Sequence, residues 1–260
     1  MIELKELTVG YGGKPVLRQV SIAFPPGQVT VLLGPNGCGK STLMKTALGL
    51  LPRQDGEILY DGVDLERLTT RQVARKAAYL AQSREIPSIT ARRMVLHGRF
   101  PYLGYPRRYR AEDYGIAQKA LEWAGAGDLA DRPMQELSGG QRQKVYLDMA
   151  LAQDTETVFM DEPTTYLDVR HQLEVMTVSR RLADMGRAVV LVLHDLSMAL
   201  READRLAVLA DGALRQIGTP EEIFAGGELD RAFGVTVRRV CTESGWLYYC
   251  QEKQESKETE

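Results

Sequence analysis

The chain has 260 residues, a formal net charge of −2 and a hydrophobic fraction of 44%, values ordinary for a soluble globular protein. Four Glu and two Lys within 251–260 account for that charge, so the remainder is neutral, which argues against a globally basic nucleic-acid binder. The longest apolar run, 188–193, is far shorter than the roughly 20 residues that span a bilayer. No signal peptide is recognisable, so we expect a cytoplasmic protein. Three cysteines without a CxxC and three scattered histidines predict neither a disulfide framework nor a metal cluster.

Strands and helices alternate in the first and last thirds of the chain. Alternating polarity predicts strands at 2–9 and 16–24, and the unbroken apolar run 29–33 predicts a strand that is buried on both faces. A glycine-rich loop and an apolar helix over about 40–51 follow it. Further strands are predicted at 57–60, 77–82, 158–160, 188–193, 206–210 and 213–217. Asp211-Gly212 is a hairpin turn between the last two strands, and Thr219-Pro220-Glu221-Glu222 has the cap, proline and glutamate of a helix start.

The middle of the chain, 84–155, lacks strand signals and has helical periodicity at 111–126 and 139–153. We interpret it as a helical insert within an α/β core. Its first part, 84–110, holds seven Arg and one Glu, a local charge of +6. Such a stretch is either a solvated loop or a docking surface for a partner. Interleaved aromatics also suit RNA, but prolines and a glycine favour a shaped loop; the residues concerned are Phe100, Tyr102, Tyr105, Tyr109, Pro101, Gly104 and Pro106.

A phosphate-binding loop is predicted between the strand at 29–33 and the following helix. The run Gly34-Pro35-Asn36-Gly37-Cys38-Gly39-Lys40-Ser41 fits the pattern G-x-x-x-x-G-K-[ST] in the strand–loop–helix context that this pattern requires. Glycines let backbone N–H groups turn toward phosphate oxygens, and the helix N-terminus adds partial positive charge. Lys40 would reach the β and γ phosphates and Ser41 would bind Mg²⁺. The alternative is a glycine turn with an incidental lysine. Cys38, at a helix N-terminus, could have a lowered thiol pKa.

Two carboxylates follow the strand at 158–160. Asp161 and Glu162 are delivered to the carboxyl end of the sheet, where ligands of α/β proteins bind. In an enzyme with a phosphate loop, the first would hold Mg²⁺ and the second would polarise the attacking water as a general base. A solvated strand end is the alternative.

A second anion site is predicted at the start of the helix over 139–153. Leu137-Ser138-Gly139-Gly140-Gln141 places Ser138 and Gln141 at capping-box spacing, and the two glycines leave the N–H groups of the first turn bare. Two phosphate-binding segments in one chain imply either two ligands or a dimer in which each segment faces the other.

These motifs resemble those of the nucleotide-binding subunits of ATP-binding-cassette (ABC) transporters, over nearly the full length. Leu137–Gln141 is similar to the family signature, Asp161-Glu162 to its Walker B motif and Leu167-Asp168 to its D-loop. Gln82 matches the Q-loop residue that reaches Mg²⁺ and senses the membrane partner. His194 matches the switch histidine at the γ phosphate, and Tyr11 the aromatic that stacks on adenine. Tyr11 could also be a simple strand residue, and Gln82 is identified by its spacing alone.

The resemblance implies the fold, the ligands and the site. It implies a P-loop NTPase cassette, α/β, in which a RecA-like sheet and an antiparallel β subdomain (1–83 and 156–234) surround an inserted helical subdomain (84–155). A terminal hairpin and a disordered tail occupy 235–260, with disorder expected over the last ten residues. ATP and Mg²⁺ are implied, the metal on Ser41, Gln82 and Asp161, with Glu162, His194, Gln82 and Lys40 in catalysis. The implied ATP contacts are Tyr11, Gly34, Pro35, Asn36, Gly37, Cys38, Gly39, Lys40, Ser41, Thr42, Ser138, Gly139, Gly140, Gln141 and Asp168.

In this family two subunits sandwich two ATP molecules, each between the phosphate loop of one subunit and the signature of the other. The implied partners are a second copy or a homologous ATPase, integral-membrane permease subunits and, indirectly, an exported substrate-binding protein, with no nucleic acid. The implied location is the cytoplasmic face of the inner membrane. A coupling helix of the permease would dock near Gln82 and the arginine-rich stretch.

Several strings are similar to the ATPases of iron-chelate importers, a branch that also serves haem, cobalamin and some oxyanions. They are Glu162–Asp168, Arg170–Glu174, Leu151–Thr155 and Gly98–Tyr102. Import of an iron chelate, such as a siderophore or haem, is therefore the expected function. The alternatives are transport of cobalamin, molybdate or a metal ion, and a non-transport ABC ATPase of DNA repair or translation. A P-loop kinase is disfavoured by Ser138-Gly139-Gly140. Against repair, 41–137 has no sustained heptads, and against translation, the chain has a single cassette.

Overall fold

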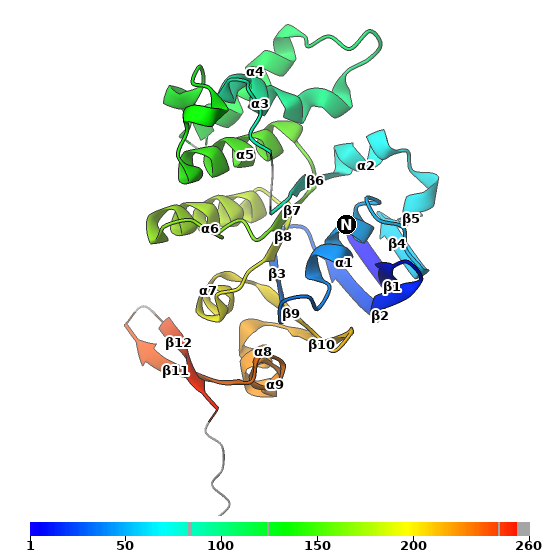
Figure 1. Cartoon of the computed structure of the whole chain (residues 1–260), viewed down its shortest axis with the longest axis vertical. Helices are drawn as coiled ribbons and strands as arrows, with labels where there is room; N and C mark the ends of the chain where they lie inside the picture. The colour runs from blue at the N-terminus through cyan, green and yellow to red at the C-terminus, as the bar shows by residue number, and fades with distance from the viewer. Residues whose placement is uncertain (83–84, 124, 244, 254–260) are drawn as a thin grey trace, which may run out of the picture.

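The computed structural model describes residues 1–82, 85–123, 125–243 and 245–253, which form a mixed α/β fold (Figure 1). Its main sheet has the order β10-β9-β3-β8-β7-β6, with β10 antiparallel to β9 and the other neighbours parallel. The strands are β3 (Val29–Leu33), β6 (Ala77–Leu80), β7 (Thr157–Asp161), β8 (Ala188–Val192), β9 (Arg205–Ala210) and β10 (Ala213–Gly218). This arrangement confirms the predicted fold class.

The central strands are apolar throughout because both faces of the main sheet are covered. Along β3, Val31 and Leu33 join one hydrophobic cluster, whereas Leu32 joins the other, beneath the antiparallel sheet. The first cluster includes the helices α5 (Gly139–Gln153), α6 (Val169–Asp184) and α7 (Leu196–Glu202). Along β7, Val158 and Met160 again face the helices and Phe159 faces the opposite way. Alternate side chains of a strand enter opposite layers, so a buried strand shows the continuous apolar run seen in the sequence.

A second, antiparallel sheet covers one face of the main sheet together with α1. Its order is β2-β1-β4-β5, with β1 (Ile2–Tyr11), β2 (Lys14–Phe24), β4 (Asp55–Tyr60) and β5 (Val63–Asp64). The rings of Phe24 and Phe159 meet edge to face at 5.5 Å between centroids. The helix predicted over 40–51 is shorter: α1 (Lys40–Ala47) ends before Gly49, which has a left-handed φ of 69°. Such a residue closes a helix because it turns the chain out of the helical path.

The helical part of the chain stacks against β6, at one edge of the main sheet (Figure 1). Its central helix is α5 (Gly139–Gln153), which packs on α3 (Ala91–Leu96), α4 (Ala111–Trp123) and a 3₁₀ segment, η2 (His97–Tyr102). Short 3₁₀ turns η3 (Gly127–Leu129) and η4 (Met134–Glu136) connect α4 to α5. The helix predicted at 139–153 is confirmed in both bounds, and the one predicted at 111–126 ends at Trp123.

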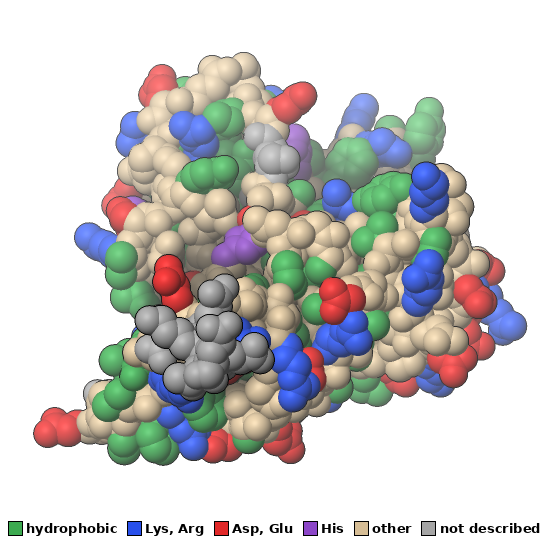
Figure 2. Space-filling view, turned by 60° about the horizontal axis from the view of Figure 1, so that its bottom comes forward, with side chains coloured by type: hydrophobic (Ala, Val, Ile, Leu, Met, Phe, Trp, Pro, Cys, Tyr) green, Lys and Arg blue, Asp and Glu red, His purple; other side chains and the backbone are tan. Residues whose placement is uncertain are grey.

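The arginine-rich stretch presents less free charge than its composition suggests. Arg99 is buried, pairs with the buried Asp113 at 3.2 Å and donates to the carbonyl of Ala152 at 2.9 Å. Arg92 forms an ion pair with Asp131. Arg93, Arg107, Arg108 and Arg110 are exposed, and Arg84 lies outside the described residues. On the face shown in Figure 2, basic and acidic side chains are interspersed.

The remaining elements are helices that contact strands of the two sheets and a terminal hairpin that packs on two of these helices. They are η1 (Leu65–Arg67), α2 (Thr70–Lys76), α6 (Val169–Asp184), α7 (Leu196–Glu202), α8 (Pro220–Gly226), α9 (Glu228–Phe233), β11 (Val235–Thr242) and β12 (Gly245–Glu252). The capping box predicted for α8 is confirmed, because Thr219 and Glu222 each accept the other's backbone N–H. The predicted terminal hairpin is β11–β12.

The prediction of a disordered tail over 251–260 is wrong for Gln251 and Glu252, which pair with Thr236 and Val235 in β11. The rest of the prediction, at 254–260, lies outside the described residues. None of the described helices is long and apolar enough to cross a membrane.

Candidate nucleotide-binding and hydrolysis site

The loop between β3 and α1 is shaped by glycines in backbone conformations that other residues rarely adopt. Gly39, at the start of α1, has a φ of 105°, and a Cβ there would lie 2.8 Å from Cγ of Leu17. Gly37 has a φ of 79°, and no atom of the described residues lies within 4 Å of the place where its Cβ would be. The loop is therefore packed on its inner side and open at Gly37, as a cradle for a bound anion requires.

Lys40 is held inside this loop. Its Nζ donates to the carbonyl oxygens of Gly34 at 2.6 Å and Pro35 at 2.9 Å, and lies 3.8 Å from Sγ of Cys38. The side chain is buried. A buried ammonium needs such partners, because desolvation without them is costly. The positive charge is thus fixed beside the open side of the loop.

The loop borders a cavity of about 220 Å³. It is lined by Tyr11, Val16, Asn36, Gly37, Gly39, Lys40, Ser41, Thr42 and Glu162. Tyr11 is half exposed and its hydroxyl accepts from Oγ1 of Thr42 at 3.5 Å. An exposed aromatic ring at the rim of a phosphate-sized cradle offers a flat apolar surface to a nucleobase.

Ser41 and Asp161 meet at the carboxyl end of β7. The hydroxyl of Ser41 donates to Oδ1 of the buried Asp161 at 3.0 Å, and the hydroxyl of Tyr79 donates to Oδ2 at 3.0 Å. This donor set fits Mg²⁺, which takes one or two protein oxygens and completes its octahedron with phosphate oxygens and water. Within the described part of the chain, no cluster of three acidic, histidine or cysteine side chains could hold a metal without such help.

Glu162 lies at the centre of a hydrogen-bonded group formed by three segments. Its Oε1 contacts Nε2 of His194 at 2.7 Å, and its Oε2 accepts from Nε2 of Gln82 at 2.5 Å and from Oγ1 of Thr165 at 3.1 Å. Asp161 pairs with Val192 across β7 and β8, so Glu162 and His194 leave neighbouring strands at nearly the same level. The carboxylate is mostly buried and also lines the cavity beside Lys40.

The signature segment lies elsewhere on the molecule. Ser138 caps α5, accepting the N–H of Gln141 at 3.3 Å while Oε1 of Gln141 accepts the N–H of Ser138 at 3.0 Å. Ser138 and Gly139 are exposed. Among the described residues that line the phosphate-loop cavity, none belongs to 138–141. The two predicted anion sites of one chain therefore do not form a single cavity.

Asp168, another predicted ATP contact, also lies outside that cavity. It caps α6 by accepting the N–H of His171 at 2.9 Å, and the same oxygen contacts Nδ1 of His171 at 2.7 Å. The backbone N–H of His171, and then its ring, hold the pKa of the Asp168 carboxyl below its ordinary value. Asp168 is therefore ionised at neutral pH, with one carboxylate oxygen engaged within its own chain.

Sequence reasoning missed two residues that orient the carboxylates. Tyr79 contacts Asp161 from β6, and Thr165 contacts Glu162 from the turn after β7. Tyr79 is opposite Phe159 in the parallel register of β6 and β7, so a predicted strand order would have placed it beside Asp161. Thr165 has no comparable signal, because its contact depends on the turn that follows Glu162.

The chain matches the family model described as ABC transporter over residues 17–165. The chain belongs to the ABC transporter family. It is 40% identical to the achromobactin transport ATP-binding protein CbrD of Dickeya dadantii, over 92% of this chain and 90% of that protein. It is 39% identical to the iron(3+)-hydroxamate import ATP-binding protein FhuC of Bacillus subtilis, over 90% of this chain and 88% of that one.

A solved structure of a transporter described as of the metal-chelate type has the same fold, with a TM-score of 0.84, 24% identity and 97% of both chains covered. Within the ABC family, this chain is of the ATP-binding, ATP-hydrolysing type rather than a membrane-spanning subunit. Subunits of this type in import systems work as dimers with membrane permease subunits.

Proposed function

We propose that the chain couples hydrolysis of MgATP to the import of an iron chelate through a membrane permease. One observation supports the ATPase site: the Lys40 loop and the Glu162 carboxylate line the same cavity. The cargo class is supported by the relatives, whose names specify achromobactin and iron(3+)-hydroxamate transport.

The phosphate loop and its neighbours would bind MgATP. Backbone N–H groups of the loop and the Lys40 ammonium would hold the β and γ phosphates, and Tyr11 would stack on the adenine. Ser41 and Asp161 would hold Mg²⁺, which neutralises charge on the phosphate oxygens when bound. The Ser41–Asp161 hydrogen bond supports this role because it holds the two oxygens 3.0 Å apart.

Glu162 would act in hydrolysis, together with His194 and Gln82, which contact its carboxylate. A general base must lie within hydrogen-bond reach of the water that it activates, and Glu162 borders the cavity beside Lys40. His194, Gln82 and Thr165 contact its two oxygens, and the contacts with His194 and Thr165 would still orient the carboxylate once Gln82 has moved. His194 would also approach the γ phosphate, and Gln82 would exchange its contact with Glu162 for Mg²⁺.

The second half of each site would come from another subunit. The tip of α5, where Ser138 and Gly139 are exposed, presents the positive end of a helix, which attracts an anion. A second copy or a homologous ATPase would place this tip on the γ phosphate held by the first. Dimer closure would then depend on ATP, since ATP forms part of the interface.

The permease would contact the surface between α2 and η2. A cavity of about 630 Å³ lies there, lined by both segments and by the loop that follows η2, and bordered by the exposed Phe100, Tyr105 and Arg107. Arg107 lies over the ring of Phe100, 4.7 Å from its centroid. An aromatic, basic hollow suits a short helix of the permease with an acidic or polar tip. With the permease at this surface, the chain would lie on the cytoplasmic face of the membrane, and the permease would receive its cargo from an exported binding protein.

Replacing Glu162 with Gln in the organism that encodes the chain tests the proposal. ATP hydrolysis by the purified chain should fall by about 10²- to 10⁴-fold because the general base is lost, while MgATP binding persists. The variant strain should lose uptake of radiolabelled iron from one class of chelate. The classes to be compared are hydroxamate, carboxylate and catecholate siderophores and haem. Uptake of cobalamin should not change.

Glu156→Gln provides the matched control, since Glu156 precedes the same strand at its opposite end and is exposed. This variant should hydrolyse ATP and import iron at the normal rate. Normal uptake of every iron chelate in the Glu162→Gln strain would refute iron-chelate import, and loss of cobalamin uptake alone would reassign the cargo.

A further inference from the structure

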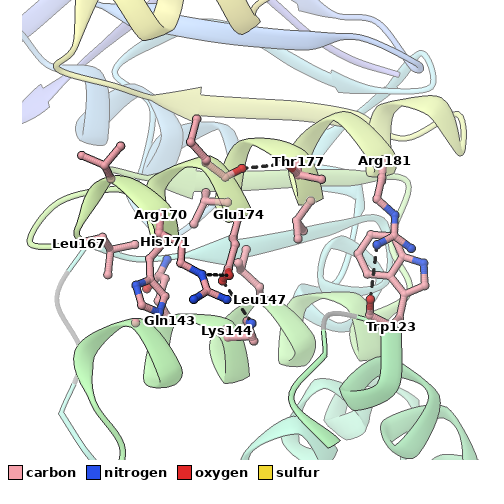
Figure 3. Close-up of a pocket in the computed structure, with 15 residues that line it drawn as sticks. Trp123, Gln143, Lys144, Leu147, Leu167, Arg170, His171, Glu174, Thr177 and Arg181 are labelled. Atoms are coloured by element: carbon pink, nitrogen blue, oxygen red, sulfur yellow. Dashed lines mark hydrogen bonds and ion pairs between the residues drawn. The ribbon is translucent and has the colours of Figure 1, made fainter.

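A groove of about 770 Å³ separates α5 from α6, along the seam between the helical part of the chain and the main sheet (Figure 3). Lys144 and Glu174 form an ion pair across it at 3.2 Å, and Arg181 lies over the ring of Trp123, 3.9 Å from its centroid. Figure 3 shows His171 extending from α6 toward α5. The groove therefore lies between the helix that begins at the signature segment and the helix that follows Asp168.

His171 is fixed on one side by Asp168. The carboxylate accepts the backbone N–H of His171 and also contacts its Nδ1 at 2.7 Å. An ionised carboxylate can only accept hydrogen bonds, so Nδ1 must carry a proton. The orientation of the ring is therefore set by the cap of α6.

On its other side the ring lies against Gly140. A Cβ at Gly140 would be 2.4 Å from Cδ2 and 2.5 Å from Nε2 of His171, closer than real carbon atoms approach. The two signature glycines differ here, because a Cβ at Gly139 would meet no atom within 4 Å in the part of the chain that the structure describes. Gly140 therefore serves close contact with His171, whereas Gly139 leaves the tip of α5 open to a ligand.

We propose that His171 is a positioning residue that fixes the tip of α5 relative to Asp168. This inference rests on the proposed function, in which Ser138 acts on a nucleotide held by another subunit. Asp168, His171 and Gly140 form one continuous chain of contacts from the start of α6 to the start of α5. A displacement of about 1 Å at a catalytic group can cost 10²-fold in rate, so this contact governs turnover rather than binding of ATP to one subunit.

His171→Ala tests the positioning role in the full-length chain, with Arg170→Ala as the matched control. Arg170 is the preceding residue, and its side chain is 86% exposed. In His171→Ala, kcat for ATP should fall at least tenfold while the affinity of the purified subunit for MgATP stays within twofold. Arg170→Ala should match the unmodified chain in both measurements.

Gly140→Ala supplies a readout that a merely stabilising contact would not give. Its methyl group collides with His171, so it should lower kcat at least tenfold in the natural background but less than threefold beside His171→Ala. Equal losses in the two backgrounds would show that the contacts are independent, and would overturn the proposal. Loss of MgATP binding in His171→Ala would also overturn it, by assigning His171 to folding. Absence of ATPase activity in the unmodified chain would instead contradict the proposed function itself.

Discussion

The phosphate loop and the signature tip are both predicted to bind phosphate, yet the structure leaves them in opposite conditions. Around the loop, polar groups are already paired: Lys40 with loop carbonyls, Ser41 with Asp161 and Glu162 with His194. At the tip of α5, Ser138 and Gly139 are exposed, and the side chains of Ser138 and Gln141 accept each other's backbone N–H.

Under the proposed function, this difference predicts which half of the site depends on an outside partner. A paired and buried group holds its geometry before the ligand arrives, which lowers the cost of reorganisation during reaction. An exposed helix tip has the field that attracts an anion but no walls to retain one. We therefore expect the loop to bind nucleotide in a single chain, and the tip to act only against a second surface.

The largest effect should come from blocking the exposed tip. Ser138→Arg places a long side chain where the second subunit should carry its nucleotide, so ATP hydrolysis should fall by about 10²-fold or more, as when a charge-stabilising group is lost. Calorimetric titration with MgATP should show unchanged affinity of the isolated chain.

Thr219→Arg is its control, because Thr219 caps α8 through a capping box of the same type. It should leave hydrolysis unchanged. Equal loss of ATP binding and hydrolysis in Ser138→Arg would show that the tip acts within its own chain, and the contrast between the two regions would disappear.

A smaller effect should follow from modifying the closed loop at Cys38. Its Sγ lies 3.8 Å from Nζ of Lys40 and 2.7 Å from the place of a Cβ on Gly34, so an alkyl group on sulfur must displace the loop. Treatment with N-ethylmaleimide should weaken ATP binding at least tenfold, or about 1.4 kcal/mol. Cys38→Ser should bind ATP and resist the reagent, although the exposed Cys241 and Cys250 still react. Unchanged hydrolysis after complete modification of Cys38 would contradict this expectation.

The smallest effect concerns a buried carboxyl on the signature helix. Asp148 is fully buried, neither carboxyl oxygen has a hydrogen-bond partner among the described residues, and burial raises its pKa to about 8. The unfolded chain releases this proton near pH 4 and the folded chain only near pH 8. The folded form therefore holds more protons between these values, and stability must fall as pH rises through that range.

Asp148→Asn should remove this pH dependence. We expect thermal unfolding to show a rise in Tm of a few degrees at pH 8 and a smaller rise at pH 5, since about 1 kcal/mol shifts Tm by roughly 2–4 °C in a chain of this size. Asp128→Asn, an exposed change in the same helical part, should do neither. An equal change of Tm at both pH values would show that Asp148 does not titrate in the folded chain.

Much of the fold could be predicted because its signals are local. The buried strands at 29–33 and 188–193 are continuous apolar runs, and Asp211-Gly212 adopts the two left-handed conformations that its hairpin turn requires. Helix α6 was not among the predicted elements, although Asp168 caps it. The sequence does carry its signal, because residues of one helix face are buried: Val175, Met176, Val178, Ser179, Leu182 and Ala183.

The residues of the candidate site could be predicted from the sequence, but the contacts between them could not. Lys40, Ser41, Asp161 and Glu162 follow from motifs whose spacing is fixed by the strand–loop–helix path. The role of Tyr79 and the contact of His171 with Gly140 depend on the packing of elements distant in sequence. Such packing leaves no mark in any single segment, and the assignment of Gly140 to a close approach needed the structure.

The alignment of β7 with β8 sets the position of the Glu162 carboxylate relative to the His194 ring. Asp161 is opposite Val192 in the pairing of β7 with β8. Glu162 follows Asp161 by one residue and His194 follows Val192 by two, so the two side chains can meet. A slip of two residues would separate them by about 6.6 Å along the strands, beyond the reach of any hydrogen bond. Insertions in distant loops leave this alignment intact, so surface regions can diverge while the carboxylate–imidazole pair stays in place.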